Sequence, residues 1–496
     1  METEMAYNWT TLWSNIASLF ACDPSQPLMF HSGTFWCLFI LFLPIYALLK
    51  RHSRAMMLAF VVAFSLLIGY KSSGWAILLL LFTTTTDWYL ARRVVASTDP
   101  VKRKTLVSLS IVTSLLILGF FKYGNFVLLN WHAIVGGNFS PMDILTPLGI
   151  SFYTFRSISY IVDVYKGKLK PDCTWLEYAF YLSFFPSLAA GPIARGVDFL
   201  PQVRANRVAT RNEVYSGLWQ VLLGVIKKAV LADYLAQYSA LVFGLAAGEG
   251  VPLLVGAFAF TLQIYCDFAG YSDMAIGLGR IMGYNLGVNF DFPYRSRNVT
   301  EFWHRWHITL STWLRDYVYI PLGGNRKGKT RQYLNLFATM LIGGLWHGAA
   351  WTFVVWGAMH GAALCIHKAL MPKLKKIPDT PIVKILSGFI TFIFVMVTFV
   401  VFRAESMHDC MTYLRDIFVN WDSSYFHTIV TQRSLMCVVM LVIVVTHFIP
   451  KRAYAWLECR FVAAPWIVKL VVFLAVVQLV LQFASAEVQP FIYNQF

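Results

Sequence analysis

Residues 383–402 read VKILSGFITFIFVMVTFVVF, and this stretch decides the class of the protein. It carries a single charged side chain, Lys384, and a helix of about twenty apolar residues is long enough to cross a bilayer. Comparable runs recur along the chain, so we predict an all-α, polytopic integral membrane protein. The candidate spans are 33–49, 55–70, 74–90, 105–121, 145–162, 213–235, 251–270, 383–402, 434–450 and 464–484.

The composition supports a membrane protein and gives no reason to expect nucleic acid. Of 496 residues, 58% are hydrophobic and 13% are charged, whereas soluble domains carry about 25% charged residues. The net charge of +16 comes from short basic clusters between apolar runs, which is the positive-inside pattern. We therefore expect the basic loops in the cytoplasm and the C-terminus outside. The eight cysteines form no CxxC pair, so we expect neither a metal site nor a disulfide framework.

Two apolar regions, 175–192 and 332–367, interrupt the alternation because basic residues flank them on both sides. Each is expected to be a re-entrant loop or a helical hairpin. Irregular backbone at membrane depth is tolerated where it lines a cavity, so both regions are candidates for a substrate pathway. Residues 271–331 are too polar to span and rich in Trp and Tyr, which favours a segment on the cytoplasmic face with an interfacial helix.

The first candidate for chemistry lies in residues 299–317, VTEFWHRWHITLSTWLRDY. Read as one helix, this segment has an aromatic arc, with His307 at its edge beside Trp303 and His304 on the polar face. His307 is then either an interfacial side chain that packs and hydrogen-bonds, or a functional group between the membrane and a wetter space.

The second candidate is His347, in the sequence GGLWHGAAW (343–351). An ionisable side chain within the membrane is costly, so His347 is a functional candidate by default. A neutral imidazole can take the proton of a hydroxyl that attacks an acyl donor. The surrounding glycines favour tight helix packing, a helix break or a close substrate. A structural histidine between glycine-rich helices is the alternative.

A third cluster, QIYCDFAGYSD (263–273), contains Asp267 and Asp273. We expect these carboxylates to pair with the downstream arginines Arg295, Arg297 and Arg305. Such pairs are either a structural network or the entrance for an anionic donor. His360 and His367, further along, are expected to be structural.

Together these stretches resemble the membrane-bound O-acyltransferase family, most closely its branch of polysaccharide O-acetyltransferases and teichoic acid D-alanylation proteins. The residues that carry the resemblance are PLGISFYTFRSISYIVDVYKG (147–167), FFPSLAAGPI (184–193), QIYCDFAGYSDMAIGLGRIMGYNLGVNFDFPYRSRNVTEFWHRWHITLSTWLRDYVYIPLGGNR (263–326) and GGLWHGAAWTFVVWGAMHG (343–361). They define a motif core of 147–361 within a single membrane domain, 28–496. Residues 1–27 extend beyond the usual start of the family, and we expect a short interfacial helix near residues 8–21.

The resemblance implies a ring of about 10–12 transmembrane helices, with re-entrant segments, around a central tunnel. It implies that His347 is the catalytic general base and that His307 is the second catalytic histidine. The residues expected to line the tunnel for donor or acceptor are Trp346, Trp303, Asn298, Arg305, Asp267 and Asp273.

The function implied is O-acetyl transfer from a cytoplasmic thioester donor, acetyl-CoA or an acyl carrier, through a membrane tunnel to an exported polysaccharide or a partner protein. We expect no bound cofactor, a multi-pass location in the inner cell membrane, and a separate extracytoplasmic SGNH-type protein as partner. One alternative is D-alanyl or other acyl transfer from a carrier protein. A transporter is an alternative of a different class, although the chain shows no inverted repeat. A non-catalytic scaffold would leave His347 unexplained.

Overall fold

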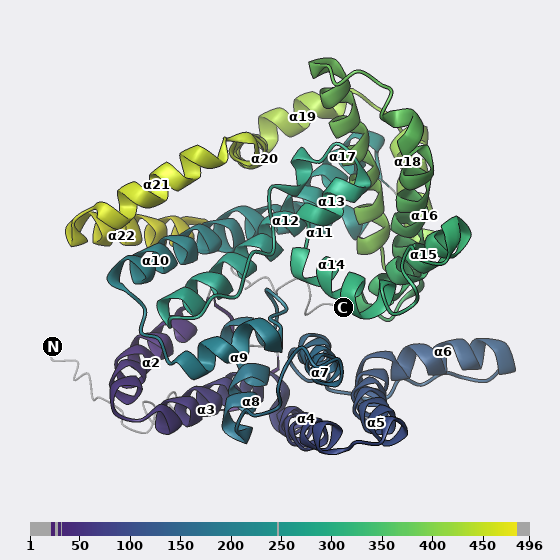
Figure 1. Cartoon of the computed structure of the whole chain (residues 1–496). Coiled ribbons are helices and arrows are strands. Elements are labelled where there is room, and N and C mark those ends of the chain that lie inside the picture. The colour runs from purple at the N-terminus through teal and green to yellow at the C-terminus, as the bar shows by residue number, and fades with distance from the viewer. Residues whose placement is uncertain (1–20, 25–27, 31, 246–247, 484–496) are drawn as a thin grey trace. The chain divides into compact units, whose positions relative to one another are not determined.

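The computed structural model describes residues 21–24, 28–30, 32–245 and 248–483 (Figure 1). All regular secondary structure in this part of the chain is helical, as the sequence predicts. Eight of the described helices are long and apolar enough to cross a membrane, or nine if a pair bent by 90° forms one span. The chain is thus an all-α, multi-pass membrane protein. The interfacial helix expected near residues 8–21 falls almost entirely outside the described residues.

Two of the expected spans are shorter than a membrane crossing requires. Residues 145–162 contain helix α7 (Ile150–Tyr165), whose side chains are nearly all buried by its neighbours. Residues 434–450 contain α20 (Ser434–Phe448), which reaches spanning length only together with the preceding α19 (Ser424–Gln432). Apolar composition alone does not separate a lipid-facing span from a helix that is buried by protein.

Contacts between residues divide the chain into two compact units, and each is described by itself. The first comprises residues 1–189 and 195–208, and the second comprises 190–194 and 209–496. Besides α7, the first unit contains α2 (Gly33–His52), α3 (Arg54–Ser73), α4 (Leu78–Ala96), α5 (Pro100–Leu118), α6 (Gly124–Val135), α8 (Trp175–Ser183) and α9 (Gly196–Ala205).

Within the first unit, α7 packs against α4 and α5 (Figure 1). Asp87 of α4 is 1% exposed, and its carboxylate accepts hydrogen bonds from Ser110 of α5, Ser157 of α7 and Tyr178 of α8. A buried carboxylate needs such donors, so this network ties four helices together. In the apolar region 175–192, only α8 and a short 3-10 turn at Phe185–Ser187 are helical, so the chain there does not form one continuous span.

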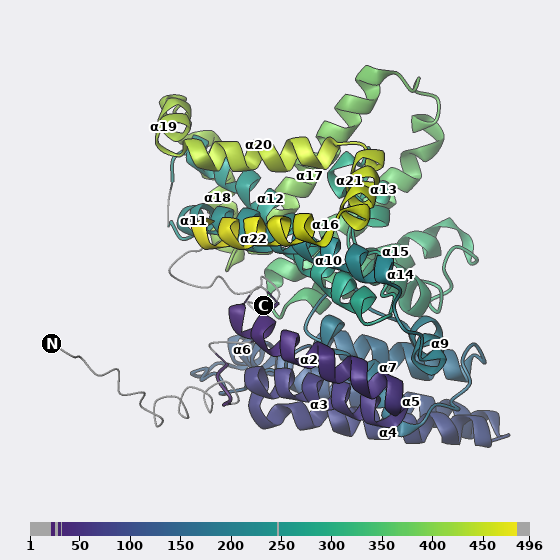
Figure 2. The ribbon, with the colours of Figure 1, turned by 90° about the vertical axis from the view of Figure 1, so that its left-hand side faces the viewer.

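The second unit also contains α19 and α20, the two helices of the bent pair, which are labelled in Figure 2. Its other helices are α10 (Arg211–Val225), α11 (Asp233–Phe243), α12 (Gly250–Ile281), α13 (Val299–Arg305), α14 (Ile308–Leu314), α15 (Gly328–His347), α16 (Trp351–Leu374), α17 (Pro381–Arg403), α18 (Met407–Val419), α21 (Lys451–Ala463) and α22 (Trp466–Phe483).

Glycines hold α10 close to α12 along a shared seam. A Cβ atom at Gly224 would lie 2.6 Å from the carbonyl oxygen of Gly270, and one at Gly277 would lie 2.6 Å from the carbonyl oxygen of Gly217. The paired glycines are seven residues apart on each helix, so they fall on one face of each. Small residues at such an interface let the two backbones approach closely.

The second apolar region, 332–367, is a helical hairpin formed by α15 and α16. Its arms also meet at glycines, because a Cβ at Gly344 would lie 2.3 Å from the carbonyl oxygen of Phe353. The arms are separated at Gly348–Ala350, where the backbone of Gly348 is extended (φ −163°, ψ 162°). Of the two arrangements that the sequence allows for this region, the hairpin is confirmed.

Candidate functional site

His347 is the last residue of α15, at the point where the hairpin turns. A helix rises 1.5 Å per residue, so His347 lies about 28 Å along α15 from Gly328. Its side chain is buried, with 3% of the residue exposed. The penultimate residue of α17, Phe402, packs on the His347 ring with a centroid distance of 5.4 Å. The imidazole is therefore held where the far ends of α15 and α17 meet.

Aromatic rings surround the His347 imidazole on other sides as well. The ring of Trp356, on α16, lies 4.9 Å from it, and that of Trp346 lies 5.1 Å from it. Both tryptophans are almost fully buried. The site thus offers an imidazole in a largely apolar environment, in which electrostatic interactions are stronger than in water.

His307 does not lie on the edge of a continuous helix, and that part of the sequence prediction is wrong. The helix expected over 299–317 breaks between α13 and α14, and His307 sits at the break in the left-handed conformation (φ 42°, ψ 56°). The residue is completely buried. Non-glycine residues at positive φ are uncommon, and they persist where the surrounding structure holds them.

Asn289, from the segment between α12 and α13, fixes this break. Its backbone carbonyl accepts the Ile308 N–H at 2.9 Å. Its side-chain Oδ1 lies 3.0 Å from His307 Nδ1 and accepts the Thr309 hydroxyl at 2.8 Å. A contact between segments eighteen residues apart therefore overrides the helical pattern that the sequence shows.

The two candidate histidines meet at one side chain. The Trp346 ring lies 6.0 Å from the His307 ring and 5.1 Å from the His347 ring. Trp303 joins the same cluster from the other side, since its ring lies 5.7 Å from Trp356 and its Nε1 donates to His360 Nδ1 at 3.3 Å. Four of the predicted site residues, His307, His347, Trp346 and Trp303, are thus brought together.

Burial lowers the pKa of His307 to about 3. The imidazole is therefore uncharged at physiological pH. The ring that packs edge-on against it at 4.7 Å, Phe268, carries no charge that would favour the imidazolium form. A neutral imidazole is the form that hydrogen-bonds or accepts a proton during acyl transfer.

The ion pairs expected for Asp267 and Asp273 are wrong. Asp267 pairs with Lys228 at 2.5 Å, and Asp273 pairs with Lys227 at 2.6 Å. Both lysines interrupt the apolar run of 213–235. They lie in a short π-helical segment after α10, Ile226–Ala232, which packs against α12 and so brings them to the two aspartates. Pairing with a cation satisfies carboxylates that are otherwise costly to bury.

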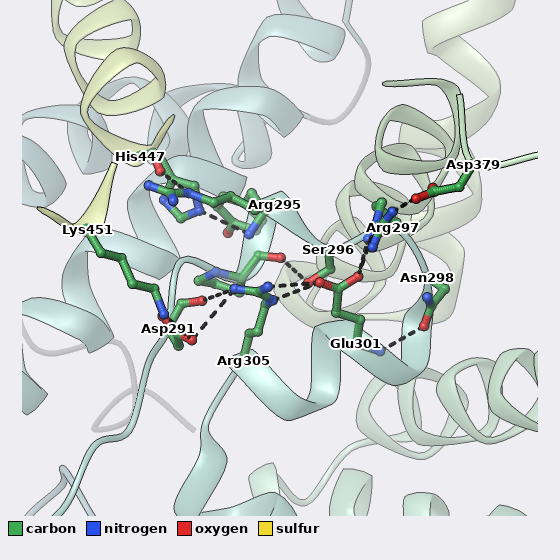
Figure 3. Close-up of polar contacts among 12 residues, drawn as sticks. Asp291, Arg295, Ser296, Arg297, Asn298, Glu301, Arg305, Asp379, His447 and Lys451 are labelled. Atoms are coloured by element: carbon green, nitrogen blue, oxygen red, sulfur yellow. Dashed lines mark hydrogen bonds and ion pairs between the residues drawn. The ribbon is translucent and has the colours of Figure 1, made fainter. Parts of the chain in front are cut away.

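The arginines have other partners, which Figure 3 shows. Arg305 pairs with Glu301 at 2.9 Å and lies 3.6 Å from Asp291. Arg295 donates to the carbonyl oxygens of His447 (2.7 Å) and Ile449 (2.6 Å), at the end of α20. The guanidinium thus satisfies carbonyls that a helix end leaves without partners.

Asn298 has a structural role as the N-cap of α13, because its side chain accepts the Glu301 N–H at 2.8 Å (Figure 3). A capping contact of this kind is worth about 0.5–2 kcal/mol. The partners of Asn298 and Arg305 are thus Glu301 and Asp291, and the place of both residues at a donor entrance stays a prediction.

A cavity of about 260 Å³ adjoins His307 through Phe290. Phe290 lines this cavity, and its ring also stacks on the His307 ring at 6.4 Å. The walls of the cavity combine aromatic side chains, such as Tyr265, with the Lys227–Asp273 pair. Asp273 therefore lines the same cavity as Phe290, although it is not paired as expected.

Sequence reasoning missed Asn289 and Trp356. Asn289 stands alone in an aromatic run, VNFDFPY, without a spacing that would link it to His307. Trp356 lies nine residues after His347, and only the hairpin turn brings the two rings together. Both depend on tertiary contacts that the local pattern does not encode.

Comparisons with known proteins show that the chain is similar to membrane acyltransferases. The model of the membrane-bound O-acyltransferase family matches residues 171–408. The chain is 42% identical to the probable alginate O-acetylase AlgI of Pseudomonas putida, over 77% of this chain and 78% of the relative. It is 35% identical to the peptidoglycan O-acetyltransferase of Helicobacter pylori, over 66% and 67%. It is 33% identical to the teichoic acid D-alanyltransferase of Streptococcus thermophilus, over 52% and 69%.

Proposed function

This chain belongs to the membrane-bound O-acyltransferase family, and from that premise we propose that it moves acetyl groups from a cytoplasmic thioester toward an exported polysaccharide, either directly or by way of a partner protein. The observation that carries this proposal is the placement of His347. Its imidazole is buried at the turn of the α15–α16 hairpin, about 28 Å along α15 from the loop that we expect in the cytoplasm. That placement suits a group that meets a donor from one side and an acceptor from the other.

In the proposed reaction His347 is the general base. A hydroxyl oxygen of the acceptor attacks the thioester carbonyl carbon while the His347 imidazole takes the hydroxyl proton. The tetrahedral intermediate then collapses, the carbon–sulfur bond breaks, and the imidazolium returns the proton to the departing thiolate. The products are an O-acetyl ester and a free thiol, with neutral His347 restored.

The cavity beside Phe290 is the proposed approach for the donor. Its apolar and aromatic walls suit the uncharged arm of a thioester, and the Lys227–Asp273 pair adds polar contacts. The Phe290 ring both lines this cavity and packs on the His307 ring. A donor that displaces this ring would therefore reach the histidine pair.

D-alanyl transfer from a carrier protein is the second candidate, favoured by the similarity to the teichoic acid D-alanyltransferase. The higher identity and coverage of the alginate O-acetylase support acetyl transfer over this alternative. We also propose a location in the inner cell membrane and a separate extracytoplasmic SGNH-type protein that completes the transfer.

The test is the acyl content of envelope and exported polymers in cells that lack this chain. We expect the O-acetyl content of one exported polysaccharide to disappear in the deletion strain and to return with the wild-type chain, while ester-linked D-alanine stays unchanged. Loss of D-alanine with unchanged O-acetyl groups would support the second candidate instead. Unchanged acyl content of both kinds would contradict the proposed function.

A further inference from the structure

Asn289 makes contacts that fix which way its amide faces. The backbone N–H of Thr309 points at one side of the amide, 3.4 Å away, and the Thr309 hydroxyl lies 2.8 Å from the same atom. A backbone N–H can only donate, so this side must be the oxygen, Oδ1. The opposite side, Nδ2, donates to the Ser272 hydroxyl of α12 at 3.0 Å. The amide is fully buried, where both of its ends need such partners.

The direction of the amide determines the state of His307. Since Oδ1 can only accept, His307 Nδ1, 3.0 Å away, must carry the hydrogen. A neutral imidazole has one N–H and one lone-pair nitrogen, so the lone pair is then on Nε2. The Ile308 N–H donates to the Asn289 carbonyl, and this backbone bond holds His307 beside the amide at its positive φ.

We infer that Asn289 is a positioning residue that holds His307 as the Nδ1–H tautomer, so that His307 acts in acyl transfer through a proton-accepting Nε2. This inference rests on the proposed function, because it assigns a role in acyl transfer to His307, the second histidine of that site. In this form His307 accepts a hydrogen bond from a second hydroxyl of the acceptor, because the attacking hydroxyl gives its one proton to His347. Neutral His307 cannot donate one from Nε2 to the oxyanion of the intermediate.

The surroundings of His307 favour the neutral form that this arrangement requires. Phe268 of α12, Phe290 of the connecting segment and Trp346 of α15 pack on the ring, and none of them is charged. His347, the residue after Trp346, is the adjoining titratable side chain on α15. Burial lowers the pKa of His307 to about 3, so the tautomer set by Asn289 persists across the physiological range.

The test is the pH profile of Asn289→Asp in proteoliposomes, measured as acyl transfer per folded molecule. The carboxylate keeps the acceptor for His307 Nδ1–H but adds a negative charge, which raises the pKa of a neighbouring imidazole by about 1–3 units. We expect the acidic limb of the profile to move upward by about that amount. Asn289→Leu, which removes the acceptor, should lower activity about 10–100-fold at every pH, the usual loss when the group that orients a working imidazole is removed.

Asn335→Asp is the matched control, because Asn335 is another buried asparagine, on α15, that bonds to the carbonyl of Gly324. Its profile should superimpose on the wild type. An Asn289→Asp profile that also superimposes on the wild type would overturn the inference, as would an equal shift in Asn335→Asp.

A readout that needs no activity separates this inference from the proposed function. In histidine-labelled protein in lipid, nitrogen NMR distinguishes Nδ1–H from Nε2–H, and His307→Gln identifies the His307 signals. We expect Nδ1–H. An Nε2–H tautomer overturns the inference whatever the chain transfers. Nδ1–H together with full activity in His347→Ala would instead leave the inference standing and overturn the proposed role of His347.

Discussion

The two histidines of the site show different limits of sequence reasoning at the residue scale. His347 could be found because it is an ionisable side chain in the glycine-rich run GGLWHGAAW, where retaining it has a cost. His307 could be found as a candidate, but its position could not. A helical wheel assumes a continuous helix, and the bonds from Asn289 break the helix at that residue.

The lowered pKa of His307 predicts an acid sensitivity of the folded protein. The unfolded chain binds a proton near pH 6.5, whereas the folded chain does so near pH 3, so stability falls as pH drops below about 6.5. Between pH 7 and pH 5 this single group should cost about 2 kcal/mol. Thermal unfolding of wild type and His307→Gln in detergent tests it, since the wild type should lose more stability over that range. Equal losses would contradict the neutral, buried state of His307.

At the scale of elements, the hairpin of α15 and α16 was predictable and its packing was not. Basic residues on both flanks of 332–367 require the chain to return to the side from which it came, so the pattern allows a hairpin. Which glycines carry the packing depends on the partner helix. Gly344 lies against α16, whereas a Cβ at Gly343 would have only the tip of Leu314 within reach, at 3.1 Å.

The glycine seam between α10 and α12 predicts a strong effect of a small substitution. A methyl group at Gly224 would overlap the Gly270 carbonyl and the Met274 backbone nitrogen, at 2.6 and 2.8 Å. Gly224→Ala should therefore destabilise the protein by about 1–3 kcal/mol, the usual cost of overpacking. Gly119→Ala is the control, since nothing lies within 4 Å of its added Cβ. Comparable melting temperatures of the two variants would show that the seam is not close-packed.

The contacts of Arg295 predict a stability effect that is distinct from donor binding. Arg295→Gln removes a guanidinium that bonds two carbonyls at the end of α20. We expect a lower melting temperature and lower folded yield, with the KM for the thioester unchanged per folded molecule. A raised KM with unchanged stability would favour the donor entrance that the sequence suggested at this position.

At the scale of the whole molecule, hydropathy and charge predict the class of the protein but not the number of crossings. Ten spans are expected from the sequence, and the described residues contain eight, or nine with the bent pair. The chain is an all-α membrane protein, as expected, but α7 shows that an apolar helix of sixteen residues can be buried by protein instead of lipid. Similarly, α20 needs α19 to reach spanning length. The ring around a central tunnel follows from family resemblance and stays a prediction.

The distribution of basic residues predicts which loops face the cytoplasm. Basic residues place the loop before α15 in the cytoplasm, and alternation then places the segment after α18 outside. Cysteine introduced at Lys329 should resist a membrane-impermeant maleimide in intact cells, and cysteine at Asp422 should react. Both native side chains are exposed, and Lys329 avoids the positive φ of 83° at Gly328. Labelling at Lys329 from outside would contradict the orientation.

The central claim is that His347 carries the acyl transfer, and His347→Gln tests it most directly when compared with His360→Gln. His360 is also fully buried against Trp356, but its ring nitrogens bond Trp303 and Thr398. The measurement is acyl product formed per folded molecule by each purified variant in proteoliposomes. We predict a loss of about 10²–10⁴-fold for His347→Gln, the range for a lost general base, and near wild-type turnover for the folded fraction of His360→Gln. Near wild-type turnover by folded His347→Gln would contradict the claim.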